Sequence, residues 1–295
     1  MIKKIVKAGI EKLGYDIEIH RLPSPKKPGS NGISGVENIS CTPVWPLPRA
    51  ANAPSNDEIR QTFAKFGDGW HYAYEFEGKL SLEGNNYGIP FQTVDRPLKR
   101  FKHFMPYLVD ACGGSLKGKR ILDIACNSGF FSIQCALMGA EVIGFDGREE
   151  LIEQANFIKN IIGIDNVEFK VMDFWSMNPE ALSGKFDACL CLGLLYHLPK
   201  PIEALELLRT MSKGPILLNT QVHRSPHPEI LLLWEKDDEG RMTIREGVVA
   251  RPSKKAVELM LRHAGFSEWF EIPVDSKIAP KDYRQGRVAS WIIKV

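Results

Sequence analysis

The sequence predicts an α/β fold, in which helices cover both faces of a doubly wound sheet of seven strands. From residue 116 onward, short apolar segments alternate with longer amphipathic ones, and this order builds a parallel sheet with helices between its strands. The first apolar segment runs directly into a turn of small residues that opens a helix. Acidic residues also close or directly follow three successive apolar segments, which indicates a ligand site at one edge of the sheet.

The individual elements follow from the spacing of apolar residues along the chain. Seven runs have the length and apolar content of buried strands, at residues 120–125, 141–145, 167–171, 186–192, 215–219, 268–273 and 288–294. Four segments have helical spacing, at residues 130–138, 149–162, 201–211 and 253–264. A further helix is expected to begin near Asp57, because Ser55 or Asn56 can cap its first turn.

The composition is that of an ordinary soluble globular protein. The chain has 295 residues, of which 44% are hydrophobic and 25% charged, and both values are typical of folded domains. A net charge of +2 gives no overall attraction to nucleic acid. The six cysteines form no Cys-x-x-Cys pair, and no apolar run approaches the roughly 20 residues of a membrane span. We therefore expect a cytoplasmic protein with reduced thiols, no structural metal and no integral membrane association.

We divide the chain into three parts. Residues 1–56 are predicted to hold an amphipathic basic helix and a Pro-rich linker, and the helix is expected to contact the domain, a partner or a membrane surface. Residues 57–115 form an accessory cap segment, in which the alternating aromatic residues Trp70 and Tyr72 either pack in the core or line a substrate pocket. Residues 116–295 form the ligand-binding domain.

The turn after the first predicted strand carries the first family resemblance. Asp123 precedes a run of small residues that ends at Gly129, and small residues allow backbone amides to approach a ligand closely. This segment resembles motif I of class I methyltransferases, with Ala125 and Asn127 standing where glycines are usual. The resemblance implies a Rossmann-like seven-stranded sheet and S-adenosylmethionine as the cofactor.

Two more acidic residues extend the predicted cofactor site. Asp146 ends the second strand, 23 residues beyond Asp123, where a carboxylate that binds ribose hydroxyls sits after such a turn. Asp173 follows the third strand, and the resemblance implies that an acid here binds the adenine amine while Phe174 or Met172 flanks the ring. A dinucleotide dehydrogenase shares the first two features, but it usually keeps the complete Gly-x-Gly-x-x-Gly motif, which this chain lacks.

A sharper resemblance follows the fourth strand, at residues 193–201. The run Leu-Tyr-His at 195–197 resembles the signature of methyltransferases related to the wobble-uridine tRNA enzymes, which make 5-oxyacetate or methoxy derivatives of uridine. The resemblance extends over residues 70–295 and implies that Tyr196 contacts the cofactor or the acceptor. It also implies that Tyr196 and Arg287 would hold the extra carboxylate of carboxy-S-adenosylmethionine, the cofactor of some relatives. The chain departs from the family at Asn219, where a Glu is common, and at residues 249–251, where a Trp is usual.

Histidines at the expected ligand edge are the candidate general bases. Methyl transfer to a hydroxyl requires that the proton be removed, and His197 follows the fourth strand while His223 follows the fifth. In the same segment, His227 is a candidate for the acceptor wall. Arg287 is a candidate for binding an anionic group of the substrate. His223, His227 and Glu229 have no established metal-ligand spacing, so we predict no metal.

The leading hypothesis is an O-methyltransferase that acts on a hydroxyl of a sugar, glycan precursor or other small metabolite. The start of the chain at residues 13–17 is similar to methyltransferases found with glycan or secondary-metabolite enzymes. The alternatives are a tRNA wobble-uridine (U34) methyltransferase and a non-catalytic subunit that retains the S-adenosylmethionine pocket. An exposed basic face on the accessory segment would favour tRNA, and its members would be Arg96, Lys99, Arg100 and Lys102.

Overall fold

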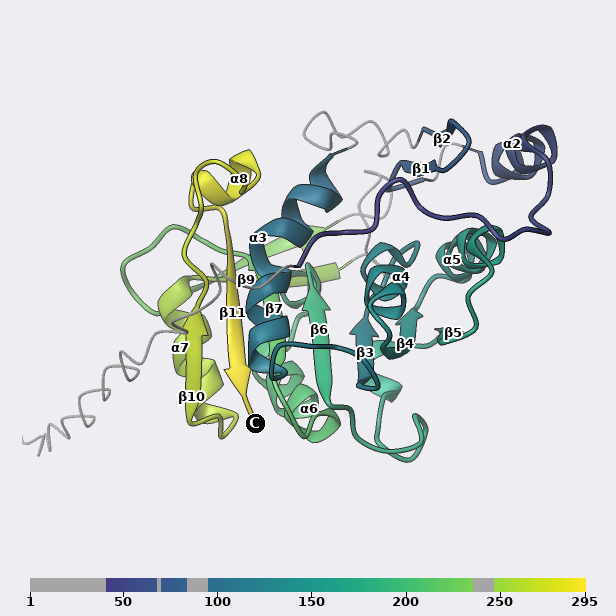
Figure 1. Cartoon of the computed structure of the whole chain (residues 1–295). Coiled ribbons are helices and arrows are strands. Elements are labelled where there is room, and N and C mark those ends of the chain that lie inside the picture. Colours follow the sequence, from purple (N-terminus) through teal and green to yellow (C-terminus); the bar gives the residue numbers. More distant parts are fainter. Residues whose placement is uncertain (1–40, 68–69, 84–94, 236–246) are drawn as a thin grey trace, which may run out of the picture. The chain divides into compact units, whose positions relative to one another are not determined.

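The computed structural model describes residues 41–67, 70–83, 95–235 and 247–295. The predicted N-terminal helix lies outside these ranges. The largest feature of the described structure is a sheet of seven strands in the order β10-β11-β7-β6-β3-β4-β5 (Figure 1). These strands are β3 (Arg120–Ile124), β4 (Glu141–Asp146), β5 (Val167–Val171), β6 (Ala188–Leu192), β7 (Ile216–Gln221), β10 (Glu268–Glu271) and β11 (Val288–Lys294).

The strand directions confirm the α/β class and add one detail to it. β3 pairs in parallel with both β4 and β6, β4 pairs in parallel with β5, and β6 does so with β7. β11 runs antiparallel to both β7 and β10, so the sheet is mixed at one side. All seven predicted strands are present, with ends shifted by at most two residues.

The four predicted helices are also confirmed, as α4 (Phe130–Leu137), α5 (Glu149–Ile162), α6 (Pro201–Met211) and α7 (Lys254–His263). α2 (Asn56–Lys65) starts at the expected place, with Ser55 as its cap in a reciprocal hydrogen-bond arrangement with Glu58. Three further elements are α3 (Arg96–Ala111), which the sequence analysis did not predict, and the short helices α8 (Lys281–Arg284) and η4 (Leu195–His197). None of the helices in the described ranges is long and apolar enough to cross a membrane.

The strands present alternate side chains to two separate apolar cores, as a period of two requires. Ile121, Leu190 and Leu217 face a core shared with α3, α4 and α5. Leu122, Cys189 and Leu218 face the opposite core, which is shared with α6 and α7. Figure 1 shows α3 crossing the first of these faces. Residues 57–115 contribute to this same core, while the boundaries drawn at residues 56 and 115 stay a prediction.

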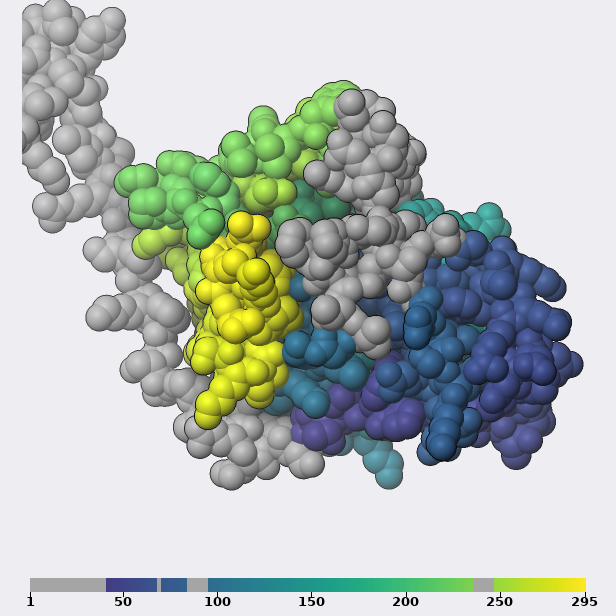
Figure 2. Space-filling model, turned by 90° about the horizontal axis from the view of Figure 1, so that it is seen from above, coloured from purple at the N-terminus to yellow at the C-terminus, as the bar shows by residue number. Residues whose placement is uncertain are grey.

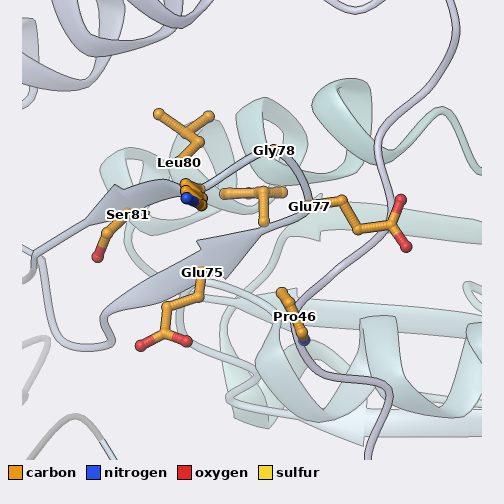
Figure 3. Close-up of a pocket in the computed structure, with 8 residues that line it drawn as sticks. Pro46, Glu75, Glu77, Gly78, Leu80 and Ser81 are labelled. Atoms are coloured by element: carbon orange, nitrogen blue, oxygen red, sulfur yellow. The ribbon is translucent and has the colours of Figure 1, made fainter.

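Two hairpins lie outside the main sheet. β1 (Tyr74–Phe76) pairs with β2 (Leu80–Leu82), and β8 (Ile230–Glu235) pairs with β9 (Gly247–Pro252). A cavity of about 440 Å³ lies against the first hairpin, between Pro46, Glu75 and Ser81 among others (Figure 3). A second cavity of about 390 Å³ lies where β3, β4 and β5 begin. No predicted site residue lines either cavity.

Candidate functional site

The carboxyl ends of β3, β4 and β6 bring the predicted site segments together. β3 lies between β4 and β6 in the sheet, and Asp123 is paired with Gly144 on one side and Leu190 on the other. The chain leaves all three parallel strands at the same edge, where open α/β sheets bind ligands. Figure 2 looks onto this edge, and the segment after β7 (green) and the region of α8 and the start of β11 (yellow) both reach the surface there.

The turn between β3 and α4 has the backbone of a glycine-rich loop although it contains one glycine. Ala125 and Asn127 have φ values of 56° and 55°, which is the left-handed region that glycine normally occupies. Gly129 has a φ of 80°, and a Cβ atom there would lie 2.6 Å from the Phe169 ring. Tyr74 holds the turn from outside, because its hydroxyl donates to the Ser128 carbonyl at 2.6 Å. The conformation therefore explains why the residues of this turn are small.

Asp123 lies beneath this turn and is buried. Its carboxylate accepts a hydrogen bond of 2.6 Å from the Ser132 hydroxyl on α4. Burial raises the pKa of the Asp123 carboxyl to about 7, and the Ser132 hydrogen bond offsets this only in part. This acid consequently anchors α4 to β3, and its contacts are with the protein itself.

Asp146, the predicted ribose acid, is also buried at the end of β4. It accepts hydrogen bonds from the Asn127 backbone amide at 3.1 Å and from the Arg148 amide at 3.2 Å. The Arg148 guanidinium occupies both carboxylate oxygens as well, at 2.9 and 3.1 Å. Asp146 thus joins the turn after β3 to the end of β4, and a partly exposed arginine covers its charge.

The third predicted acid, Asp173, follows β5 and caps the short helix η3 (Phe174–Ser176). Its carboxylate accepts a hydrogen bond of 2.8 Å from the Trp175 amide. Phe174 is buried in the core shared with α6 and α7, whereas Met172 is half-buried at its edge. Of the two residues expected to flank an adenine ring, Met172 therefore has the more accessible side chain.

A histidine and a glutamate meet beside the carboxyl end of β6. His197 Nδ1 lies 2.6 Å from Glu235 Oε2, and the two side chains are 13% and 5% exposed. The Tyr196 ring packs on the His197 ring with centroids 4.0 Å apart. Burial and then the Glu235 charge raise the pKa of Tyr196 to about 12, so its hydroxyl stays protonated at neutral pH.

The other predicted catalytic and acceptor residues lie farther toward the surface. His223 Nε2 is 3.7 Å from Glu229 Oε2, and both side chains are at least a third exposed. His227 and Arg287 are exposed. Asp237 and Asp238 lie outside the described residues. Within the described ranges, His197 is therefore better enclosed for catalysis than His223.

The two aromatic residues of the accessory segment, Trp70 and Tyr72, are both buried but have different neighbours. Trp70 is buried and packs against Phe63, with ring centroids 4.5 Å apart. Tyr72 is also buried, but its hydroxyl lies 3.5 Å from Arg100 Nη1, and its ring approaches Phe130 at the start of α4. Both side chains therefore belong to the core, and Tyr72 lies on the side of it that adjoins Arg100 and the start of α4.

The four basic residues of α3 that would favour tRNA as an exposed face do not form one. Arg96 makes a bidentate pair with Asp282, Lys99 pairs with Asp95, and Arg100 is buried. Of these four residues, Lys102 alone is exposed and makes no ion pair with a carboxylate in the described part of the chain. The linear spacing of these residues does not reveal that Arg96 pairs with Asp282 and that Arg100 is buried.

Comparison with known proteins identifies this architecture. A family model described as a methyltransferase domain matches residues 115–264, which is half of the chain. The chain belongs to this methyltransferase family. Its relation to the wobble-uridine enzymes is confirmed, and it is a class I methyltransferase that depends on S-adenosylmethionine.

Two curated relatives and one solved domain illustrate the relationship. The tRNA U34 carboxymethyltransferase of Pseudomonas fluorescens (strain Pf0-1) is 30% identical over 185 residues, covering 62% of this chain and 54% of the relative. The ubiquinone biosynthesis O-methyltransferase of Acinetobacter baylyi (strain ATCC 33305 / BD413 / ADP1) is 26% identical over 133 residues, covering 44% and 55%. The chain spans about half the length of these relatives.

The solved relative is the N-terminal domain of EvdMO1, which has the same fold. Its structure with SAH bound has a TM-score of 0.64 and 23% identity, and covers 83% of this chain and 98% of that domain. The same domain in the presence of SAH and D-fucose gives a TM-score of 0.62. This likeness extends well before residue 115, so it includes part of the accessory segment of the methyltransferase.

The residues at this edge fit an adenosyl cofactor in their chemistry. The turn after β3 offers small residues in left-handed conformation, and Asp146 offers the carboxylate that two ribose hydroxyls require. The fit has one condition, because a carboxylate has about four acceptor sites and Arg148 takes three of them. If Asp146 binds the ribose, the Arg148 side chain would therefore have to move away from it.

Three residues of this site were not predicted from the sequence. Glu235 and Tyr74 lie 38 and 54 residues from their partners His197 and Ser128, and no local pattern reports such contacts. Arg148 is different, because it stands two residues after Asp146. A cation at this spacing from a predicted buried acid is a signal that could have been used.

We expect Asp123→Asn to make the free energy of unfolding less dependent on pH. Because the folded pKa of about 7 lies above the ordinary value, the carboxyl costs nothing below about pH 4 and destabilises the fold as pH rises through 7. The cost approaches about 4 kcal/mol. Urea unfolding of the cofactor-free methyltransferase should therefore show a steeper loss of stability from pH 4 to 7 than the variant. Parallel curves would show that Asp123 titrates normally.

Proposed function

We propose that this methyltransferase transfers a methyl group to a hydroxyl of a small acceptor, namely a sugar, a glycan precursor or another small metabolite. The observation that carries the proposal is the contact of 2.6 Å between His197 and the buried carboxylate of Glu235. A hydroxyl needs a general base, and this pair is arranged as one. The pair also lies beside the carboxyl end of β6, at the sheet edge where the acceptor is expected to bind.

The two residues would act together on the acceptor proton. Glu235 accepts the Nδ1 hydrogen of His197, which leaves Nε2 as the lone pair that can accept a proton. No described residue occupies Nε2 in the structure. When His197 takes the hydroxyl proton, the adjacent carboxylate stabilises the positive charge on the imidazole. Glu235 is thus a positioning residue, and His197 is the proposed catalytic residue.

The proposed cofactor contacts are those of the three strand ends. Asp146 would bind the ribose, Asp173 the adenine amine, and the backbone of Ala125, Asn127 and Gly129 would approach the remainder of the molecule. S-adenosylmethionine supplies an electrophilic methyl group on a sulfonium centre. The protein's main contribution is then to align the acceptor oxygen and exclude water. Asp123 would support the turn from beneath through Ser132.

Two observations favour a small acceptor. One curated relative is an O-methyltransferase of ubiquinone biosynthesis, and the EvdMO1 domain was solved in the presence of D-fucose. Three of the four basic residues of α3, namely Arg96, Lys99 and Arg100, are paired or buried, so this helix offers little to a phosphate backbone. His227, Tyr196 and Arg287 remain candidates for contacts with the acceptor at the rim.

The alternative is methylation or carboxymethylation of tRNA at the wobble uridine. It is favoured by the 30% identity to tRNA U34 carboxymethyltransferase over 185 residues. In this reading, Tyr196 and Arg287 would hold the extra carboxylate of carboxy-S-adenosylmethionine. The third hypothesis, a binding subunit without activity, predicts cofactor binding without transfer to any acceptor.

Labelled cofactor separates these functions. The full chain is incubated with S-adenosylmethionine that carries a radioactive methyl group, and with either a macromolecule-free cell extract or unmodified tRNA. We expect label in small molecules, in a form that survives mild alkaline hydrolysis as a methyl ether does and an ester does not. Label in tRNA alone would replace the proposal with the second function. Cofactor binding with no label in either fraction would favour the third.

A further inference from the structure

A buried arginine at the ligand edge has a charge that its described contacts do not balance. Arg100 of α3 is 7% exposed. Its Nε donates to the Tyr283 hydroxyl at 3.1 Å, its Nη2 donates to Asn219 Oδ1 at 3.0 Å, and its Nη1 lies 3.5 Å from the Tyr72 hydroxyl. All three acceptors are neutral. Arginine stays protonated in proteins, so a full positive charge is enclosed here.

Arg96, one turn earlier on the same helix, shows the contrast. Its guanidinium binds both oxygens of Asp282, at 2.9 and 2.8 Å. Among the described residues, Asp282 therefore pairs with Arg96 and acts on Arg100 only at longer range, and no carboxylate makes a hydrogen bond to Arg100. The rings of Phe104 and Phe131 lie 5.7 and 5.2 Å from the Arg100 guanidinium carbon. Their π faces attract a cation but do not cancel its charge.

The surroundings of Arg100 place it beside the proposed reaction site. Asn219 belongs to β7, the neighbour of the strand that leads to His197, and Tyr72 adjoins the start of α4. Burial raises the pKa of both Asp123 and Tyr196, and the Arg100 charge acts on both in the opposite direction. The guanidinium is therefore within electrostatic reach of both the turn after β3 and the segment after β6.

We propose that Arg100 binds an acidic group of the methyl acceptor, so that the acceptor is a hydroxyl compound bearing a carboxylate or a phosphate. This inference rests on the proposed function and narrows its substrate class. A buried cation is costly unless a countercharge compensates it, and a guanidinium matches the oxygens of either anion. Asn219, Tyr72 and Tyr283 are the neutral contacts that hold the guanidinium in place, and the acidic group of the ligand would supply the countercharge.

The substitution Asn219→Asp tests the inference, because it places a carboxylate on the guanidinium and keeps the residue's shape. The full chain is saturated with S-adenosylhomocysteine, and its unfolding temperature is followed against inorganic phosphate or acetate at an ionic strength held constant with chloride. The wild-type protein should show a saturable rise with at least one anion. The concentration at half-effect should be at least tenfold higher in Asn219→Asp. Phosphate and acetate as separate arms show which acid is preferred.

Two further variants keep the result interpretable. Arg100→Gln removes the charge directly and should lose the anion effect in the same way. Ser290→Ala removes an acceptor of the Asn219 amide without changing charge, and should respond to anions like the wild type. The Kd of each variant for S-adenosylhomocysteine is measured separately by calorimetry.

Three results would overturn the inference. The first is the absence of a saturable anion effect in the wild type, and the second is an undiminished effect in Asn219→Asp. The third is a loss in Arg100→Gln that is confined to S-adenosylhomocysteine affinity, which would assign Arg100 to the cofactor. These measurements need no methyl transfer. The proposed function can therefore fail in the labelling experiment while the anion response is intact.

Discussion

Replacing His197 with alanine is expected to lower kcat for methyl transfer by about 10²–10⁴-fold, the usual contribution of a general base. The Kd for S-adenosylmethionine should change little, because the proposed cofactor contacts lie at other strand ends. Glu235→Gln should lower kcat by about tenfold or more with KM nearly unchanged, and Glu235→Asp should recover part of the loss. Steady-state kinetics with the acceptor found by labelling, and calorimetry with the cofactor, check these values.

His263→Ala is the matched control for this prediction. His263 lies 3.7 Å from Glu206 on the protein surface, so it reproduces a histidine and carboxylate pair away from the proposed site. Its kinetics should equal those of the wild type. Wild-type turnover in His197→Ala would remove His197 from catalysis and return His223 to consideration as the base.

Asp146→Asn is expected to raise the Kd for S-adenosylmethionine by about 100-fold or more. Two hydrogen bonds from ribose hydroxyls to a carboxylate would become bonds to a neutral amide, and a bond to a charged group contributes about 1.5–3 kcal/mol. Isothermal calorimetry measures the change. Urea unfolding of the free protein is needed beside it, because Asp146 also accepts the Asn127 amide.

Asp165→Asn serves as the control, because Asp165 is exposed and lines the cavity at the opposite edge of the sheet. Its cofactor affinity should match the wild type. Unchanged affinity in Asp146→Asn, with a folded variant, would mean that the ribose does not bind at the end of β4.

Elements with a strong local pattern were predicted well from the sequence. The strands from β3 to β11 in the main sheet and the helices α4 to α7 agree within two residues, because apolar periodicity and turn residues are local signals. α3 was not predicted, although Phe101, Phe104, Met105 and Leu108 have helical spacing. Pro106 inside this helix argues locally against it, and packing on the sheet outweighs that local preference.

The candidate site was predicted where it depends on strand ends and not where it depends on distant contacts. Asp123 and Asp146 lie at the ends of apolar strands and His197 follows one, and the parallel sheet brings such ends to one edge. Glu235 belongs to a hairpin whose second strand begins only at Gly247. Arg100 meets Asn219 and Tyr283 across 119 and 183 residues. Contacts of this kind arise from the tertiary fold and leave no periodic trace in the sequence.

The ion pair between Arg148 and Asp146 has a consequence for the catalytic cycle. A buried carboxylate that lost its ligand with every departing product would be left uncompensated, and each release would be slowed by that penalty. Arg148 is 24% exposed and stands two residues away, so, if Asp146 binds the ribose, Arg148 would serve as the counter-ion each time the ribose leaves. Release of the product and formation of the Arg148–Asp146 ion pair would then be one exchange, and the cofactor-free methyltransferase would keep this carboxylate paired.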